Sequence, residues 1–427
     1  MTNANVPNQC EIGFAGLDTH ARRMARAMAG QGLRVAACDS HAENVKILHQ
    51  ESSGIPIRIA ADVAELVGIL REPRNVAVTS SETGSDLFNE LQAQLEAGDL
   101  LIDVGDCHFK ECLHRARYLT ERNLRYLEIS FIDREENSSG PILIVGGRVE
   151  TWHRASPLLD PITSNEIGES SVTHLGPAGA GHFVKMIYEG VEYSLTHLVL
   201  ESFEVLKRAL NLDDKGVQDA TSGWFIGPLN RFRRDDAVRW TSQAAGELSV
   251  PSPTLDAVVG MRALSETDRQ NNFATTPFRH PIGHFGDDAE SILTELHGAL
   301  YTATLITHAQ GMAVLAAGSE HYGFEIDPVD IIRLWRICCG HRAALLDEIA
   351  SALRDTLALP NLLDDDNLSE KVMEQQECLR HAVWRATSQG ISVPGLMASL
   401  DYLDSYRGAW LPINLIQPPP LAGLVRR

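Results

Sequence analysis

The chain of 427 residues is too long for a single hydrophobic core, because such cores stop growing near about 250–300 residues, so its length predicts two domains. Its composition, 44% hydrophobic and 22% charged, is that of a globular protein and excludes extensive disorder. A formal net charge of −20 without a basic segment excludes nucleic acid as an expected partner, and no apolar segment reaches the length of a membrane helix.

Residues 1–13 have neither the basic start nor the apolar stretch of a signal peptide, so we expect a cytoplasmic protein without a membrane partner. The seven cysteines lack CxxC spacing and are expected to be free thiols. Cys107, His108, Cys112 and His114 do not have the spacing of a zinc site, so we expect buried side chains there and no bound metal.

From Cys10 to about Gly147, short apolar or β-branched runs alternate with amphipathic stretches, which is the pattern of a parallel sheet built from βαβ units. Between the first two runs, Met24 and Met28 recur at helical spacing, and Gly32 marks the expected end of that helix. The predicted strands are residues 11–16, 33–39, 75–80, 100–105, 124–130 and 141–147.

From His182 onward the chain has helical periodicity and no convincing strand, so the second domain is predicted to be mainly helical. We place the domains at residues 1–181 and 182–416, followed by a short tail at 417–427 that begins with a polyproline-like QPPP. The longest predicted helical segments are residues 182–210, 289–316, 328–356 and 367–389.

The first predicted strand leads into a glycine turn. Gly13 and Gly16 lie where a dinucleotide-binding turn lets pyrophosphate approach the N-terminus of a helix. Asp18 and Ala21 occupy the later glycine positions, and Asp18 brings a negative charge toward the phosphates. The alternative is a turn that merely connects a strand to a helix.

Asp39 ends the second predicted strand, 23 residues after Gly16. An acidic side chain at this place accepts hydrogen bonds from the adenosine ribose, which favours NAD over NADP. Asp39 is equally well placed to cap a helix over residues 41–50, and the sequence leaves both interpretations open.

The segment GPAGAGHFVKMIYEGVEY begins with glycines and continues as a helix. Four polar residues fall on one face of that helix, namely His182, Lys185, Glu189 and Glu192. Phe183, Ile187 and Val191 form an apolar stripe on another face. The polar face is either a solvated surface with Lys–Glu pairs or a ligand site that the glycines allow to approach closely.

This segment resembles the signature around the catalytic lysine of the 6-phosphogluconate dehydrogenase family. Residues 140–147, 239–251 and 404–417 resemble the same family in the same order, so the resemblance spans nearly the whole chain. It implies an α/β Rossmann-type N-terminal domain, an all-α C-terminal domain and a homodimer. It also implies oxidation of a small-molecule β-hydroxy acid with a nicotinamide cofactor, followed by decarboxylation.

The resemblance assigns roles to individual residues. Lys185 is the implied base and later acid, and Glu192 the group that protonates carbon after CO₂ leaves. The implied cofactor-binding residues are Gly13, Gly16, Asp39, Val78 and Asp106. The implied substrate-binding residues are His182, Glu189, Tyr193, Arg239, Thr241 and Arg262, and for each arginine alone a surface ion pair is the alternative.

The departures from the family pattern lie at ligand positions. Asp39-Ser40-His41 replaces the residues that bind the NADP 2′-phosphate, and Asp106 and Glu189 replace amides. Val78-Thr79-Ser80-Ser81 and Ser130-Phe131-Ile132-Asp133 replace a cofactor loop and a substrate loop. A deletion falls between Trp224 and Arg239, and Pro420 lies where the family's tail delivers an arginine to the partner subunit.

Five acids, Asp18, Asp39, Asp106, Asp133 and Glu189, would therefore disfavour a dianionic substrate. Three functions remain open. The first is an NAD-dependent oxidoreductase acting on a different β-hydroxy acid, such as one with a positive group. The second is a catalytically silent binding or assembly protein. The third is a lyase or isomerase that uses Lys185 and Glu192 without a dinucleotide.

Overall fold

The computed structural model describes residues 9–79, 85–132, 141–159, 162, 165–166, 169–170, 172–222, 224, 236–271, 288–339, 342–355 and 359–408. Two compact units are distinguished, Met1–Glu189 with Val314–Arg354 and Gly190–Ala313 with Asp355–Arg427. No helix within the described ranges is long and apolar enough to cross a membrane. The predictions for Ser80, Ser81, Asp133, Pro420, the tail at 417–427 and most of the segment between Trp224 and Arg239 fall outside these ranges.

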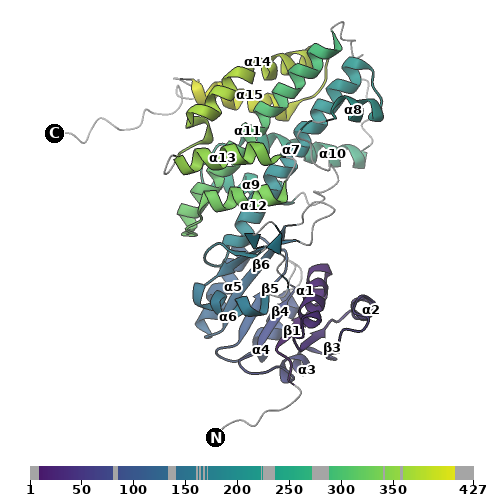
Figure 1. The fold of residues 1–427 in the computed structure, drawn as a ribbon, viewed down its shortest axis with the longest axis vertical. Coiled ribbons are helices and arrows are strands. Elements are labelled where there is room, and N and C mark those ends of the chain that lie inside the picture. The colour runs from purple at the N-terminus through teal and green to yellow at the C-terminus, as the bar shows by residue number, and fades with distance from the viewer. Residues whose placement is uncertain are drawn as a thin grey trace, which may run out of the picture. The chain divides into compact units, whose positions relative to one another are not determined.

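The first unit contains an eight-stranded sheet with the order β10-β7-β6-β5-β4-β1-β2-β3 (Figure 1). β1 to β6 are parallel, β7 is antiparallel to β6, and β10 is parallel to β7. The order β3-β2-β1-β4-β5-β6 is that of a dinucleotide-binding fold, which confirms the predicted Rossmann type. The strands are β1 (Ile12–Ala15), β2 (Val35–Cys38), β3 (Ile57–Ile59), β4 (Asn75–Val78), β5 (Leu100–Asp103), β6 (Arg125–Ile132), β7 (Ile142–Gly147) and β10 (Val172–His174).

All six predicted strands are present, whereas β3 and β10 were not predicted. β3 and β10 have three residues each, which is too few for a clear hydrophobic pattern. A separate two-stranded ribbon pairs β8 (Asn165–Glu166) with β9 (Glu169–Ser170).

Helices cover both faces of the sheet, which explains why its central strands are continuous apolar runs. On one face, Phe14 of β1 packs with Met24 and Met28 of α1 in a core that also includes residues of α2 and α6. On the other face, α3, α4 and α5 pack against residues such as Val76 and Leu101. The helices are α1 (Thr19–Gly30), α2 (Ala42–Glu51), α3 (Val63–Gly68), α4 (Ser85–Gln94), α5 (Phe109–Glu121) and α6 (Val149–Leu159).

After β10 the described chain contains helices and no further strand, which confirms the all-α C-terminal domain. The segment 328–356, predicted as one helix, forms two helices, because Cys339 leaves helical geometry with φ −127° and ψ 63°. The helices are α7 (Ala180–Leu210), α8 (Asp214–Ala220), α9 (Asp236–Glu247), α10 (Pro253–Asn271), α11 (Ala289–Tyr322), α12 (Pro328–Cys338), α13 (Ala343–Asp355), α14 (Asp366–Ser388) and α15 (Pro394–Arg407).

Within the second unit, a buried carboxylate holds α15 against α7. Glu201 of α7 accepts hydrogen bonds from the amides of Gly395 and Leu396, at 2.8 and 3.0 Å. These amides belong to the first turn of α15, where backbone donors have no partner within the helix. An anion at this position also interacts favourably with the helix dipole. Glu201 thus fixes where α15 begins.

Candidate active site

Glycines let the beginning of α7 approach the neighbouring strand and loop of the first unit. Gly176 and Gly179 have positive φ values of +131° and +93°. A Cβ atom on Gly176 would lie 2.4 Å from the Phe324 carbonyl oxygen, and one on Gly181 would lie 3.1 Å from the Ile144 carbonyl oxygen. These glycines therefore allow close packing within the protein, whereas the sequence suggested a close approach to a ligand.

Lys185 lies on the buried part of α7 and contacts two carboxylates. Its side chain is 9% exposed, and its Nζ atom lies 3.0 Å from Asp106 Oδ1 and 3.7 Å from Glu189 Oε1. Asp106 belongs to the loop between β5 and α5, and Glu189 follows Lys185 by one helical turn. Glu189 is half-buried, so this part of the helix is not the solvated surface that the sequence left open.

His182 forms an ion pair with Glu128 of β6. His182 Nδ1 lies 3.2 Å from Glu128 Oε2, and His182 Nε2 lies 3.0 Å from the Gly105 carbonyl oxygen. Burial alone lowers the pKa of His182, but Glu128 outweighs this effect and raises the pKa to about 9. His182 is therefore an imidazolium at neutral pH, and both ring nitrogens face acceptors.

The Glu128 carboxylate also receives the Gly181 amide, at 2.9 Å from Oε1. Glu128 thus places a negative charge at the N-terminus of α7, where the helix dipole favours it. Sequence reasoning missed this residue, although a single acid inside the apolar run RYLEISFI was an available signal.

A second buried network lies between β5 and α5. Asp103 Oδ2 accepts hydrogen bonds from Arg115 Nη1 at 2.6 Å and from the Tyr126 hydroxyl at 3.1 Å. The Cys107 and Cys112 sulfur atoms are 3.5 Å apart, and both side chains are buried, as predicted. Among the described residues, His182 is the third potential metal ligand near these thiols, but its ring nitrogens face Glu128 and Gly105.

The predicted cofactor turn is tightly packed at the carboxyl ends of β1 and β4. Gly16 has a φ of +82°, and a Cβ atom there would lie 1.9 Å from Thr79 Oγ1. Gly13 lies within β1 and not in the turn, and a Cβ atom there would lie 3.0 Å from Leu70 Cδ1. The Val78 side chain is fully buried in the core, so only its backbone can face a ligand.

Asp39 connects this turn to the beginning of α2. Its carboxylate accepts hydrogen bonds from the Leu17 amide at 2.8 Å, the His41 amide at 2.7 Å and the Asn44 side chain at 3.0 Å. The His41 ring nitrogen Nδ1 also lies 3.3 Å from Asp39 Oδ1, and the Asp39 side chain is only 6% exposed. Asp18 caps α1 by accepting the Ala21 amide at 2.8 Å.

In the second unit, Arg239 of α9 and Arg262 of α10 line one pocket of about 410 Å³. Each arginine also contacts an acid of the same pocket, Asp236 at 2.6 Å and Glu266 at 2.8 Å respectively. The predicted pair of arginines is therefore brought together, and the predicted ion pairs are also present. Arg262 Nη1 donates to the Tyr193 hydroxyl at 3.1 Å.

Two other predicted residues of the second unit are buried. Thr241 is fully buried, and its hydroxyl donates to the Ala237 carbonyl of its own helix. It also packs against Gly190, where a Cβ atom would lie 2.4 Å from Thr241 Oγ1. Glu192 is 5% exposed.

Two family profiles match the chain. The profile for the NAD binding domain of 6-phosphogluconate dehydrogenase matches residues 11–176, and that for the C-terminal domain of the same enzyme matches residues 181–235 and 233–419. The chain belongs to the 6-phosphogluconate dehydrogenase family.

Several similar proteins are named as enzymes of this family. A decarboxylating 6-phosphogluconate dehydrogenase of Synechocystis sp. is 30% identical over 451 residues, covering 97% of this chain and 94% of the relative. One from Staphylococcus aureus is 28% identical over 438 residues, with coverages of 95% and 94%. A solved Plasmodium falciparum 6-phosphogluconate dehydrogenase has the same fold, with a TM-score of 0.83 at 23% identity and coverages of 96% and 95%.

The chain is thus a 6-phosphogluconate dehydrogenase-like oxidoreductase of a family that uses NAD(P). The turn at Gly16 fits a dinucleotide, because it has the positive φ and the place in the sheet that such a turn requires.

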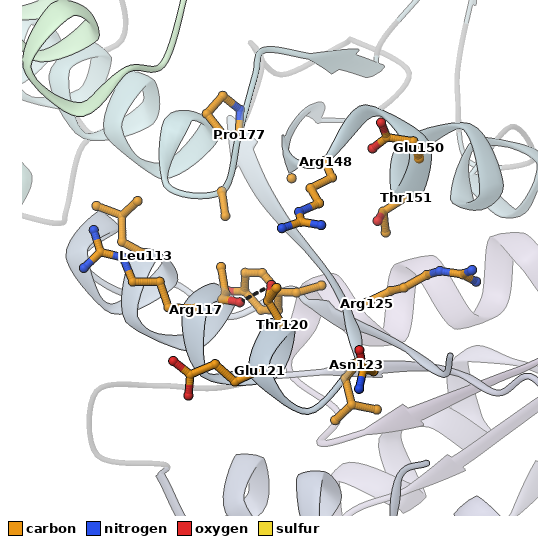
Figure 2. A pocket seen from close by; sticks show the side chains of 15 residues that line it. Leu113, Arg117, Thr120, Glu121, Asn123, Arg125, Arg148, Glu150, Thr151 and Pro177 are labelled. Atoms are coloured by element: carbon orange, nitrogen blue, oxygen red, sulfur yellow. Dashed lines mark hydrogen bonds between the residues drawn. The ribbon is translucent and has the colours of Figure 1, made fainter. Parts of the chain in front are cut away.

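A pocket of the first unit lies elsewhere in this 6-phosphogluconate dehydrogenase-like fold. It has a volume of about 730 Å³ and is lined by Arg125, Arg148, Thr151 and Pro177 among others (Figure 2). Arg125 begins β6, whereas Gly16, Asp39 and Asp106 follow the carboxyl ends of parallel strands. The pocket therefore contains none of the predicted site residues.

Proposed function

We propose that the protein catalyses NAD-dependent oxidation of a β-hydroxy acid, with decarboxylation where the keto acid product allows it. The observation that carries this proposal is the buried Lys185, whose Nζ atom lies 3.0 Å from Asp106 at the carboxyl end of β5. In doubly wound folds, ligands bind beside the carboxyl ends of the strands. A lysine fixed at this edge supports a role for Lys185 beside a bound cofactor and its substrate.

The family resemblance gives the chain's residues their proposed tasks. Lys185 accepts the proton of the substrate hydroxyl and later returns a proton to the carbonyl oxygen, while Glu192 delivers a proton to carbon after CO₂ leaves. A bound nicotinamide would supply the hydride acceptor. Asp106 and Glu189 hold the Lys185 side chain in place between turnovers, because each carboxylate lies within 4 Å of Nζ.

His182 has a supporting task in this proposal. Both of its ring nitrogens are directed at protein acceptors, Glu128 and Gly105, so it does not contact the substrate directly. It fixes the Gly105 carbonyl, and the next residue is Asp106. We therefore assign His182 to positioning the loop that contacts Lys185.

The proposed cofactor preference is NAD. Asp39 lies at the carboxyl end of β2, and its negative charge opposes the additional phosphate of NADP. A displaced Asp39 would leave the Leu17 and His41 amides without their present acceptor, so accommodating NADP by moving this side chain is costly.

The proposed substrate has fewer negative charges than 6-phosphogluconate, or bears a cationic group. Asp106 and Glu189 add two carboxylates near Lys185. In the second unit, Asp236 and Glu266 already pair with the two arginines that the resemblance assigns to phosphate binding. Each uncompensated like charge costs about 1 kcal/mol or more in a partly buried site.

The test is turnover of 6-phosphogluconate and of a panel of neutral and amino-substituted β-hydroxy acids, each with NAD and NADP. Reduction of NAD with a panel member, and little with 6-phosphogluconate, supports the proposal. Efficient NADP-dependent oxidation of 6-phosphogluconate contradicts the altered substrate and cofactor. The same assay with Lys185→Met shows whether any turnover depends on this lysine.

One observation favours a second candidate, an enzyme or binding protein that uses no dinucleotide. Asp18 and Asp39 already occupy the Ala21 and Leu17 amides near the glycine turn. Thermal denaturation with NAD, NADH, NADP and NADPH distinguishes the candidates, because a ligand at 100 times its Kd stabilises a protein by about 2.7 kcal/mol. The absence of a shift with all four would favour the second candidate.

A further inference from the structure

Cys107 and Cys112 form a close thiol pair beside the proposed active site. Their sulfur atoms are 3.5 Å apart, and a disulfide requires an approach to about 2.05 Å, so one bond-forming movement of about 1.5 Å separates the two states. Cys107 lies in the loop before α5, and Cys112 lies in the first turn of that helix. A loop residue can make this movement without unwinding the helix.

Two cations surround the pair. Arg115 Nη1 lies 3.8 Å from Cys107 Sγ, and a His182 ring nitrogen lies within 4.8 Å of both sulfur atoms. The hydrogen bond with Cys112 lowers the pKa of the Cys107 thiol, and His182 and Arg115 act in the same direction. Burial instead raises the pKa of Cys10, Cys38 and Cys378. Thiolate character makes a cysteine a nucleophile, so Cys107 is chemically distinct from these three.

We propose that Cys107 and Cys112 are a modification site, a dithiol that a small peroxide oxidises reversibly to a disulfide. The Cys107 thiolate attacks one peroxide oxygen, the O–O bond breaks, and the products are a sulfenic acid and hydroxide, which takes up a proton to become water. The Cys112 sulfur then attacks the sulfenic sulfur, and the S–O bond breaks as the S–S bond forms. The released hydroxide takes the Cys112 proton and leaves as a second water.

The burial of both thiols determines the class of oxidant. Cys107 is 3% exposed and Cys112 is fully buried, so a bulky disulfide reagent cannot reach them in the folded state. The residues on either side of Cys107, Asp106 and His108, are partly exposed. A local opening of this loop therefore admits a molecule of the size of hydrogen peroxide.

The sequence provides a direct assay, because trypsin cleaves after Arg74, Lys110 and Arg115 and so separates the two cysteines. The reduced full-length protein is treated with increasing hydrogen peroxide, alkylated under denaturing conditions and digested. We expect peptides 75–110 and 111–115 to be joined by a disulfide at peroxide doses that leave Cys378 alkylated, and to separate after dithiothreitol. Oxidation of Cys378 first, or irreversible oxidation of Cys107 without joined peptides, overturns the proposal.

Two variants complete the test. Cys112→Ser removes the resolving thiol but keeps a hydrogen-bond donor beside Cys107, so the Cys107 sulfenic acid should persist and react with dimedone added under denaturing conditions, whereas its absence contradicts the order of steps. Cys378→Ser is the matched control, and it should leave the joined peptides unchanged. The readout is a covalent product in the protein itself, so it is independent of whether the proposed dehydrogenase activity is found.

Discussion

Glu128 and His182 form a buried ion pair in which Glu128 Oε2 lies 3.2 Å from His182 Nδ1. The same Glu128 side chain caps the N-terminus of α7 through the Gly181 amide. Because Lys185 follows His182 by three residues on that helix, the pair fixes the segment that carries the proposed base. Its contribution can be measured through the pH dependence of stability.

We expect Glu128→Gln to destabilise the first unit by about 3–5 kcal/mol at pH 6.5, because it leaves a buried imidazolium without its counter-charge. The folded-state pKa of His182, about 9, lies above its ordinary value of 6.5. The stabilisation from the charged pair is therefore fully present below about pH 6.5 and is lost as the pH rises through about 9.

Urea unfolding of the wild type and the variant between pH 6.5 and 9 measures this effect. The difference in unfolding free energy between the two should shrink as the pH rises. A difference that is constant across this range would mean that His182 is neutral in the folded wild type.

Lys185→Met should lower kcat by about 10²–10⁴-fold with whichever substrate is turned over, because general acid–base catalysis contributes about that much. Methionine keeps most of the side-chain volume and removes the charge. Lys207→Ala is a suitable control, since Lys207 lies on the same helix with a side chain that is 39% exposed. Similar rates for the wild type and Lys185→Met would remove Lys185 from the mechanism.

Asp106→Asn and Glu189→Asn, which restore the amides of the family pattern, should each lower the KM for 6-phosphogluconate. Removing one nearby like charge changes binding by about 1 kcal/mol, which corresponds to roughly fivefold. Steady-state kinetics measure the effect, and Glu43→Gln, at an exposed acid of α2, is the control. An unchanged KM in both variants argues that these carboxylates do not face the substrate.

Asp39→Asn should shift the cofactor preference toward NADP, because it removes the charge that opposes a 2′-phosphate. The comparison is the ratio of kcat/KM for NAD and NADP. Asn44→Ala removes one of the hydrogen bonds of Asp39 and keeps its charge, so it separates electrostatics from loop geometry. If Asn44→Ala changes the ratio as much as Asp39→Asn does, the preference depends on the loop.

Gly16→Ala should destabilise the first unit more than Gly32→Ala. Both glycines have positive φ, +82° and +92°, so both substitutions introduce backbone strain of about 1–2 kcal/mol. Only at Gly16 does the added Cβ meet an atom, Thr79 Oγ1 at 1.9 Å, whereas no atom lies within 4 Å of a Cβ at Gly32. Overpacking adds about 1–3 kcal/mol, which thermal unfolding resolves. Equal losses would mean that Thr79 rotates away at no cost.

The sequence was sufficient to predict the strands and helices whose residue pattern is continuous or repeats along the chain. Buried strands such as Val35–Cys38 are uninterrupted apolar runs, and α1 has its methionines at helical spacing before Gly32, so both were predictable. β3 was not, because the alternation of Ile57, Arg58 and Ile59 covers only three residues and is too short to distinguish a strand from a loop. The break at Cys339 follows a continuous helical pattern and was likewise invisible.

In the candidate site, too, residues marked by a local sequence pattern were predicted, and partners that only the fold brings together were not. Lys185 and the acids around it were found because a helical spacing and a family motif mark them. The partner of His182 was not found, since Glu128 is 54 residues away and only the pairing of β6 with its neighbours brings it under α7. The hydrogen bond from the Leu17 amide to Asp39 was not predictable, because it depends on how β1 and β2 lie side by side.

Glu201 receives its hydrogen bonds from residues that lie 194 and 195 positions later in the chain. At about 5–20 residues per second, a ribosome needs roughly 10–40 s to synthesise the stretch between them. The first unit is likewise built from segments that are far apart in the sequence, because it includes Val314–Arg354 as well as the N-terminal sheet. Neither unit can be completed while its last segment is still being translated, so the nascent chain keeps apolar surface exposed during synthesis. We therefore expect its folding to depend on chaperones more than the folding of a protein whose domains are continuous in sequence.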